Sequence, residues 1–331
     1  MKSQVSLPFL ALISLLAVPG CSKSQPSASE STAAVQNASA SAAMATSSPS
    51  STKTASPVPT PNIDGQKVLQ YTKEVVAFGS RPAGSPAHQK LEQYIVSKMK
   101  GVDVEQDKFT AQTPAGQFPI NNIIAKFPGK KDGIIVVAGH YDTNYPLPKS
   151  YVGANDGGSS TALLLALADQ LRGKERDGYS VWLVWTDGEE AFVKWTDDDS
   201  LYGTKHLAQK WNADGTARKI KAFILVDMIG DADLDIQRDS NSTPWLTDLV
   251  NQAATNLGYQ SHFFQQTVGM DDDHIPFAKI GVPVVDLIDY TYGYNNVFHH
   301  SPEDTIDKLS AQSLAITSDV VMETIELVDQ R

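Results

Sequence analysis

The sequence contains one cysteine among 331 residues, so no disulfide bond can form within a single chain. It is also poor in positive charge. There are 27 lysines and arginines against 38 aspartates and glutamates, which makes the formal net charge −11. Proteins that bind nucleic acid present a basic patch or stripe, so we expect no nucleic-acid partner. The hydrophobic content of 41% and charged content of 20% are typical of a soluble globular protein.

The apolar run at the N-terminus, residues 5–18, is short for a membrane span and typical of a signal-peptide core. The run leads into "AVPGC", residues 17–21, which resembles the lipobox of bacterial lipoproteins. The resemblance implies a lipoprotein signal peptide over residues 1–21, export, and a lipid on Cys21 that anchors the chain to a bacterial membrane. Ser22 is not the aspartate that usually retains lipoproteins at the inner membrane, which favours the outer membrane. An ordinary signal peptide with an incidental cysteine is the alternative.

Residues 22–61 consist mainly of Ser, Ala, Thr and Pro, with almost no large apolar side chain. Such a segment cannot bury enough apolar surface to offset the entropy lost on ordering. We therefore expect a disordered tether, followed by a single catalytic domain over residues 62–331 that is a monomer.

Apolar residues at helical spacing alternate along this domain with short, continuous apolar runs. A Ser85 cap with Pro86 in the first turn marks one helix start. Helices are expected at residues 64–78, 85–100, 159–173, 202–212, 243–258 and 311–330. Strands are expected at residues 121–127, 133–143, 179–189, 220–230 and 282–288.

Alternating strands and helices predict an α/β fold, a three-layer αβα sandwich around a mixed, mostly parallel sheet. Continuous apolar runs are typical of strands that are buried on both faces. The first two predicted strands are joined by a short link containing "PGKKDG", so we expect them to pair antiparallel.

Acidic and imidazole side chains gather where the predicted strands end. In open α/β sheets, ligands bind beyond the carboxyl ends of the strands. These ends carry His140, Asp142, Asp187, Glu189, Glu190 and Asp227. By contrast, the acidic run "TDDDS" that follows reads as a solvated loop.

Two further candidate ligands lie in loops. Asp156 is in the glycine-rich turn "VGANDGGSS", and His300 is in "VFHHSPEDT". With His140, Glu190 and Asp227 they form a set of imidazoles and carboxylates without thiolate, which suits a catalytic zinc. A plain acidic rim remains the alternative, because Asp156 could simply cap a helix.

The order of these motifs resembles the zinc-dependent aminopeptidase family over roughly residues 64–330. The early "FGSRPAGSPAHQKLEQYI" resembles the opening of that family. Within it, "DGEEAFVKW", "DSLYGTKHLA" and "DDHIPFAKIGVPVVDLI" resemble the animal-type glutaminyl cyclases more closely than the ordinary aminopeptidases.

This resemblance implies roles for individual residues. The implied ligands of a single zinc are Asp156, Glu190 and His300. Glu189 matches the catalytic acid/base, and the matches to its acidic partners and to the substrate-contacting tryptophan are Asp227, Asp272 and Trp195.

The sequence departs from the cyclases at the substrate side of the site. Phe298 and His299 stand where the cyclases have an aromatic pair ending in tryptophan, so we expect both to contact substrate. His299 is also a rival to His300 as the ligand, and the spacing to Asp304 favours His300. The stretch "DYTYGYNNVF" is longer than the corresponding loop, and Asp271 adds an acid before Asp272.

The implied reaction converts the N-terminal glutaminyl residue of a peptide to pyroglutamate and releases ammonia. Glu189 would carry the proton, and we expect like charge from Asp227 and Asp272 to raise its pKa. One alternative is a two-zinc aminopeptidase, in which His140 and Asp227 help to hold a second metal. Another is a non-catalytic, peptide-binding lipoprotein that has kept the fold.

Overall fold

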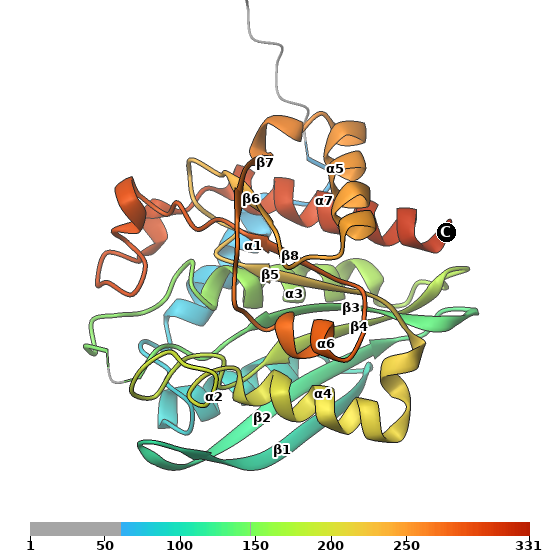
Figure 1. The fold of residues 1–331 in the computed structure, drawn as a ribbon. Helices are drawn as coiled ribbons and strands as arrows, with labels where there is room; N and C mark the ends of the chain where they lie inside the picture. The colour runs from blue at the N-terminus through green and yellow to red at the C-terminus, as the bar shows by residue number, and fades with distance from the viewer. Residues whose placement is uncertain (1–60, 146) are drawn as a thin grey trace, which may run out of the picture. The chain divides into compact units, whose positions relative to one another are not determined.

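The computed structural model describes residues 61–145 and 147–331 (Figure 1). The predicted signal peptide, with Cys21, and the predicted tether up to residue 60 lie outside the described residues. Within the described ranges, no helix combines the length and the apolar character needed to cross a membrane.

The six predicted helices all form. Ser85 caps one of them, because its side chain accepts a hydrogen bond from the His88 amide. A seventh, short helix was not expected. The helices are α1 Gly65–Val76, α2 Pro86–Lys98, α3 Gly158–Leu171, α4 Tyr202–Asp214, α5 Pro244–Leu257, α6 Ile275–Lys279 and α7 Ala311–Asp329.

Eight strands form one mixed sheet in the order β1-β2-β4-β3-β5-β8-β6-β7. The strands are β1 Asp103–Thr113, β2 Gly116–Phe127, β3 Lys131–His140, β4 Tyr179–Thr186, β5 Ile220–Asp227, β6 Ile236–Asp239, β7 Phe263–Val268 and β8 Val284–Ile288. The central pairs β4/β3, β3/β5 and β5/β8 are parallel. Their carboxyl ends therefore share one edge of the sheet.

Helices cover both faces of this sheet, as predicted (Figure 1). On one face, α1, α3, α5 and α7 pack together over strand residues such as Ile135 and Val137. On the other face, α4 and α6 pack over the alternate residues, such as Val136 and Ala138. Side chains of a strand point alternately to the two faces, so both faces of the central strands are buried.

The expected pairing of the first two predicted strands is wrong. These strands are β2 and β3, and β4 lies between them, antiparallel to β2 and parallel to β3. The link between β2 and β3 does not close a hairpin. Instead, the amides of Lys130 and Lys131 donate to the carbonyls of Arg176 and Gly178 just before β4. The tight turn occurs one strand earlier, between β1 and β2, where Thr113 pairs with Gly116.

Three strands were not predicted from the sequence, and each lies toward an edge of the sheet. β1 is an edge strand whose burial is mixed and whose sequence, "DVEQDKFTAQT", carries little apolar periodicity. β6 and β7 are short and occupy the other edge. β1 and β7 have few buried side chains, so backbone pairing with a neighbouring strand makes them strands. β6 is mostly buried but has only four residues, too few for a clear periodicity.

Candidate active site

A cavity of about 360 Å³ opens at the carboxyl edge of the parallel strands. Three loops contribute to this edge, and we name them the β3 loop (residues 141–157), the β4 loop (residues 187–201) and the β8 loop (residues 289–300). The cavity is lined by Asp156, Glu189, Glu190, Trp195, Asp227, Met228, Met270, Asp271, Asp272, Ile288, Tyr290, His299 and His300.

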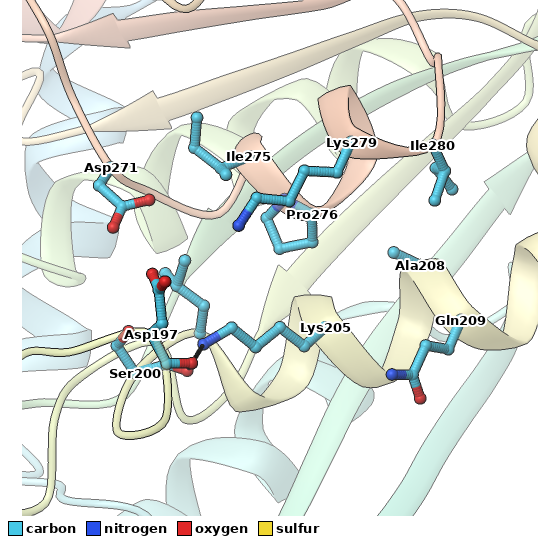
Figure 2. Close-up of a pocket in the computed structure, with 11 residues that line it drawn as sticks. Asp197, Ser200, Lys205, Ala208, Gln209, Asp271, Ile275, Pro276, Lys279 and Ile280 are labelled. Atoms are coloured by element: carbon cyan, nitrogen blue, oxygen red, sulfur yellow. Dashed lines mark hydrogen bonds between the residues drawn. The ribbon is translucent and has the colours of Figure 1, made fainter.

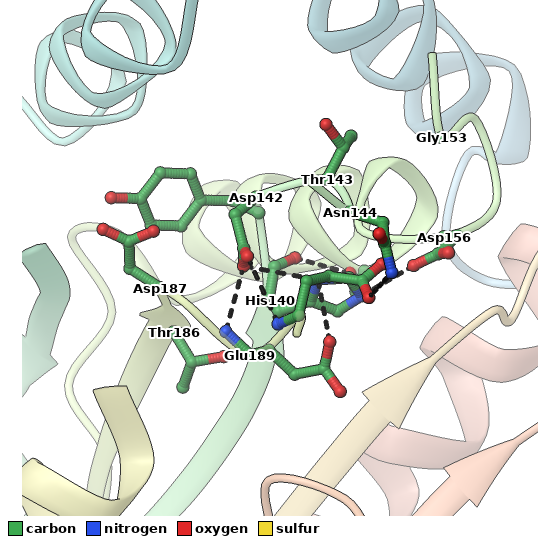
Figure 3. A network of polar contacts seen from close by, with 12 residues as sticks. His140, Asp142, Thr143, Asn144, Gly153, Asp156, Thr186, Asp187 and Glu189 are labelled. Carbon is green, nitrogen blue, oxygen red and sulfur yellow. Dashed lines mark hydrogen bonds and ion pairs between the residues drawn. The ribbon is translucent and has the colours of Figure 1, made fainter. Parts of the chain in front are cut away.

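His140, at the end of β3, lies at the centre of a buried acidic cluster beside this cavity (Figure 3). Its Nε2 atom is 3.1 Å from Oδ1 of Asp156 and 3.2 Å from Oδ1 of Asp227. Its Nδ1 atom is 3.6 Å from Asp142 and 3.8 Å from Glu189. Burial lowers the pKa of His140, but the carboxylates, Glu189 foremost, outweigh burial and raise it well above its usual range.

His300 brings together the two carboxylates that the resemblance groups with it. Its Nε2 atom is 3.0 Å from Oε1 of Glu190 and 3.3 Å from Oδ2 of Asp156. Burial lowers the pKa of His300, but Glu190 and Asp156 raise it to about 11. Donor atoms from all three loops therefore converge at one point of the cavity wall.

The site contains two groups of potential metal ligands, and within each group the ligand atoms all lie within 4.8 Å of one another. The first is Asp156, His299 and His300, and the second is His140, Asp156 and Asp227. Asp156 belongs to both groups, and its two oxygen atoms point to different histidines. Imidazole nitrogens and carboxylate oxygens without thiolate are a donor set that zinc accepts. The residues present therefore fit one zinc, and they contain the elements of a second site.

The paired glutamates are held by the β3 loop. One carboxylate oxygen of Asp142 accepts the amide of Glu189 at 3.3 Å (Figure 3). Its other oxygen accepts the amide of Glu190, also at 3.3 Å. The side-chain amide of Asn144 donates to Oε2 of Glu190 at 2.8 Å. Asp142 thus orients the turn that places both glutamates at the cavity.

The turn that carries Asp156 is held by groups far away in the sequence. The buried guanidinium of Arg81 donates to the carbonyls of Tyr141, Gly153 and Asp156. The carboxylate of Asp304 accepts the amides of Asn155 and Asp156. These contacts place Asp156 beside the other candidate metal ligands, His140 and His300. Asp156 does not act as a side-chain cap of α3.

The pKa of Glu189 is raised well above its usual range, as its predicted role as the proton carrier requires. The largest cause is burial, since only 7% of the residue is exposed. The carboxylates of Glu190, Asp272 and Asp273 raise the pKa further, while His140 lowers it. The sequence led us to expect that like charge from Asp227 and Asp272 raises this pKa. Asp272 does contribute, but burial is the larger cause.

The acidic run in the β4 loop is not uniformly solvated, contrary to expectation. Asp197 and Asp198 are exposed, but Asp199 is 2% exposed and its carboxylate accepts the amides of Phe192, Val193 and Lys194. Burial alone would raise the pKa of Asp199, and these amides hold it below its usual value. Asp199 thus orders the backbone that leads into Trp195.

Most of the predicted substrate contacts lie in the cavity, with one exception. Trp195 and His299 line it, but Phe298 does not. The Phe298 ring packs edge-on against Tyr292, and the ammonium of Lys308 lies over it. Burial lowers the pKa of His299, which favours a neutral imidazole there.

A smaller groove of about 170 Å³ lies between α4 and α6 and shares Asp271 with the cavity (Figure 2). The ammonium of Lys205 in this groove donates to the carbonyls of Asp197 and Ser200. The groove contains none of the candidate metal ligands, so the chemistry belongs to the larger cavity.

Several residues that support the site were not predicted from the sequence, because they hold its loops and do not line the cavity. They are Arg81, Asn144, Asp199 and Asp304, which hold the β3 and β4 loops. Asp199 is part of the quoted "DSLYG" motif, and Arg81 is part of "FGSRPAG". A signal was therefore present, but the sequence does not show which backbone groups those side chains meet.

Comparison with known proteins agrees with this geometry. The model of Peptidase family M28 matches residues 122–325. A glutaminyl-peptide cyclotransferase of Drosophila melanogaster is 30% identical over 266 residues, which are 71% of this chain and 74% of the relative.

Two solved structures share the fold. The glutaminyl cyclase of an Acidobacteriales bacterium is 49% identical, with a TM-score of 0.80, and covers 87% of this chain and 100% of its own. A Zn-dependent exopeptidase from Parabacteroides distasonis is 24% identical, with a TM-score of 0.72, over 82% and 99% of the two chains. The latter likeness extends to the fold alone. The chain belongs to Peptidase family M28, and within that family it is a relative of the glutaminyl-peptide cyclotransferases.

Proposed function

We propose that this chain is a zinc-dependent glutaminyl cyclase, which converts the N-terminal glutaminyl residue of peptides to pyroglutamate with release of ammonia. The observation that carries the proposal is the placement of Glu189, with its raised pKa, beside three convergent donor residues in one cavity. The named relatives, and the cyclase motifs that surround these residues, support it.

We propose Asp156, Glu190 and His300 as the ligands of a single zinc ion. His300 is preferred to His299 because its Nε2 atom lies near both carboxylates, whereas Nε2 of His299 is 3.8 Å from Asp156. When bound, zinc would supply a Lewis acid that polarises the γ-amide oxygen of the substrate.

The protein's own groups would move the proton and position the substrate. The carboxylate of Glu189 accepts a proton from the α-amine as nitrogen attacks the γ-carbon, and passes it to the leaving amide nitrogen. The new C–N bond closes the five-membered ring, the old one breaks, and ammonia leaves. We propose Asp227 and Asp272, which line the same cavity, as the acidic partners of Glu189. Burial and Asp227 raise the pKa of Asp272 well above its usual range. Trp195 and His299 form walls that hold the short side chain in a reactive geometry.

A two-zinc aminopeptidase is the second candidate, and one observation favours it. His140, Asp156 and Asp227 form a second group of ligand atoms that shares Asp156 with the first. In that reading Glu189 would activate water for peptide hydrolysis instead of carrying a proton between nitrogens. The number of bound metal ions per chain separates the candidates, with one expected for the cyclase and two for the peptidase.

The test of the reaction uses two tripeptides, one that begins with Gln and one that begins with Leu, and follows their masses. Loss of ammonia from the first, with the second unchanged, is the expected result. Release of the first residue from either peptide would overturn the cyclase in favour of the aminopeptidase.

We propose further that the protein acts as an exported, monomeric lipoprotein, held by lipid on Cys21 to a bacterial outer membrane. The "AVPGC" motif and the single cysteine support the anchor. Its substrates would be peptides or proteins with an N-terminal Gln. The mass of the mature N-terminus, compared with that of Cys21→Ser, tests the anchor. An unmodified cysteine in the mature protein would contradict it.

A further inference from the structure

The large hydrophobic side chains that are exposed among residues 61–145 and 147–331 are confined to the loops of the active-site edge. Tyr145 is on the β3 loop, Val193 and Trp195 are on the β4 loop, and the rest are on the β8 loop. We name these six residues the hydrophobic collar: Tyr145, Val193, Trp195, Tyr290, Tyr294 and Val297.

A single exposed apolar residue needs no explanation, but apolar residues gathered at one place mark a binding surface. β4, β3, β5 and β8 are consecutive in the sheet, so the three loops leave the same edge of four adjacent strands. The "DYTYGYNNVF" stretch supplies half of the collar, Tyr290, Tyr294 and Val297.

The collar reaches the catalytic cavity through two of its six residues. Trp195 and Tyr290 belong to both, since each lines the cavity and each remains more than a third exposed. The Tyr290 ring meets the His299 ring edge-on at 5.5 Å, and the Tyr290 amide donates to the side chain of Gln237. The Tyr145 ring packs against Phe118 and Phe192. Two of the exposed rings are thus held in place by neighbouring groups.

We propose that the hydrophobic collar binds the residues that follow the N-terminal glutamine, and that it selects peptides with an apolar side chain there. The inference rests on the proposed function. Cyclisation needs only the terminal residue inside the cavity, so the rest of the peptide leaves through the mouth and crosses the collar. An apolar side chain that binds to the collar is removed from water, and this stabilises the bound substrate and the transition state equally. The preference therefore appears in KM more than in kcat.

The experiment compares three substrates, Gln-amide, Gln-Gly-Ala-amide and Gln-Leu-Ala-amide, with residues 61–331, which belong to one compact unit with its own core. The expected kcat/KM is about tenfold higher for the leucine peptide than for the glycine peptide, mainly through KM. The double variant Val193→Ser/Val297→Ser should bring this ratio close to one and leave Gln-amide turnover unchanged. The matched control, Val193→Ile/Val297→Ile, should keep the preference.

Calorimetry tests the collar independently of the reaction. It compares the binding of two product peptides, pyroglutamyl-Leu-Ala-amide and pyroglutamyl-Gly-Ala-amide. If no glutaminyl peptide turns over, the proposed function fails, and tighter binding of the leucine product would still support the collar. Equal kcat/KM for the two peptides in the unmodified protein, or a preference that survives the serine variant, would overturn the inference. Sedimentation with phosphatidylcholine vesicles that depends on Val193 and Val297, without a peptide preference, would assign the collar to the membrane instead.

Discussion

The β4 loop and the β8 loop both border the cavity, but they are held in different ways. The β4 loop is tied along its length, because Asp142 and Asp199 together accept five of its backbone amides. The β8 loop is instead held at separate points, by the Tyr290 amide to Gln237, by the Tyr292 hydroxyl to Asp304 and by His300 to Glu190. Between Tyr292 and His300, Tyr294 is 84% exposed.

This difference assigns the two loops different tasks. The β4 loop carries Glu189, the proposed proton carrier, and Glu190, a proposed zinc ligand, and both roles need accurate positions. The β8 loop carries half of the hydrophobic collar, which we propose as the surface for the residues that follow the N-terminal glutamine. The loops meet at the contact between His300 and Glu190, so the β8 loop contributes to the metal site only through its last residues.

The largest expected effect is at that meeting point. His300→Ala should lose the bound zinc and all cyclase activity, because it removes one of the three proposed ligands, while His299→Ala should keep the metal. Zinc content by atomic emission, together with turnover of a Gln-leading peptide, checks both. Zinc lost from His299→Ala and retained by His300→Ala would make His299 the ligand.

Within the β4 loop, Glu189→Gln should lower kcat by about 10²- to 10⁴-fold, because the amide cannot carry the proton. Zinc content should remain that of the unmodified protein, since Glu189 is not a proposed ligand. Steady-state kinetics at saturating substrate measure the effect. Full activity would remove the proton-carrier role.

A smaller effect is expected from Asp199, which does not line the cavity. Asp199→Ala leaves three amides without their acceptor and should lower the free energy of unfolding by about 1–3 kcal/mol. It should also lower kcat, because Trp195 loses its support, whereas Asp199→Asn keeps one acceptor oxygen and should lose less. Denaturant unfolding and kinetics test this. The comparison of the two loops fails if Tyr294→Ala, in the β8 loop, lowers kcat for Gln-amide as much as Asp199→Ala does.

The smallest effect on activity is expected from His88, which supports the base of the β4 loop. Its Nε2 atom is 2.7 Å from Asp187, whose other oxygen accepts the Asn121 amide. Burial lowers the pKa of His88, but Asp187 and Glu92 outweigh it and raise the pKa to about 10. For Asp187 burial dominates, so its own pKa is raised despite His88.

Because the folded-state pKa of His88 lies above its unfolded value of 6.5, its stabilising contribution is complete below that pH and is lost as pH rises toward about 10. His88→Gln should therefore cost roughly 3–5 kcal/mol of unfolding free energy near pH 6, because Asp187 loses its partner. The difference from the unmodified protein should shrink between pH 6.5 and 10. Thermal unfolding across this range measures it, and a difference that grows with pH would contradict the assignment.

The sequence predicted the central strands and the principal helices because their periodicity and caps are local properties. Ser85 and the run from Ile134 to Ala138 carry their own signals. The pairing of β2 was not predictable in the same way. Whether β2 meets β3 or β4 depends on the path of a chain segment about fifty residues farther on. Phe298 shows the same limit at the site, since its motif position indicated a substrate contact and its ring packs against Tyr292 instead.

By itself, the sequence determined the α/β class and the residue types available for a metal and for proton transfer, and its motifs indicated the family. The tertiary structure decided the strand order, made burial the main cause of the raised pKa of Glu189, and gathered the exposed apolar residues of three loops into one collar. The physical reason is the range of the interactions involved. Helical periodicity and caps depend on residues a few positions apart, whereas burial, pKa shifts and surface clusters depend on side chains that only the folded chain brings together.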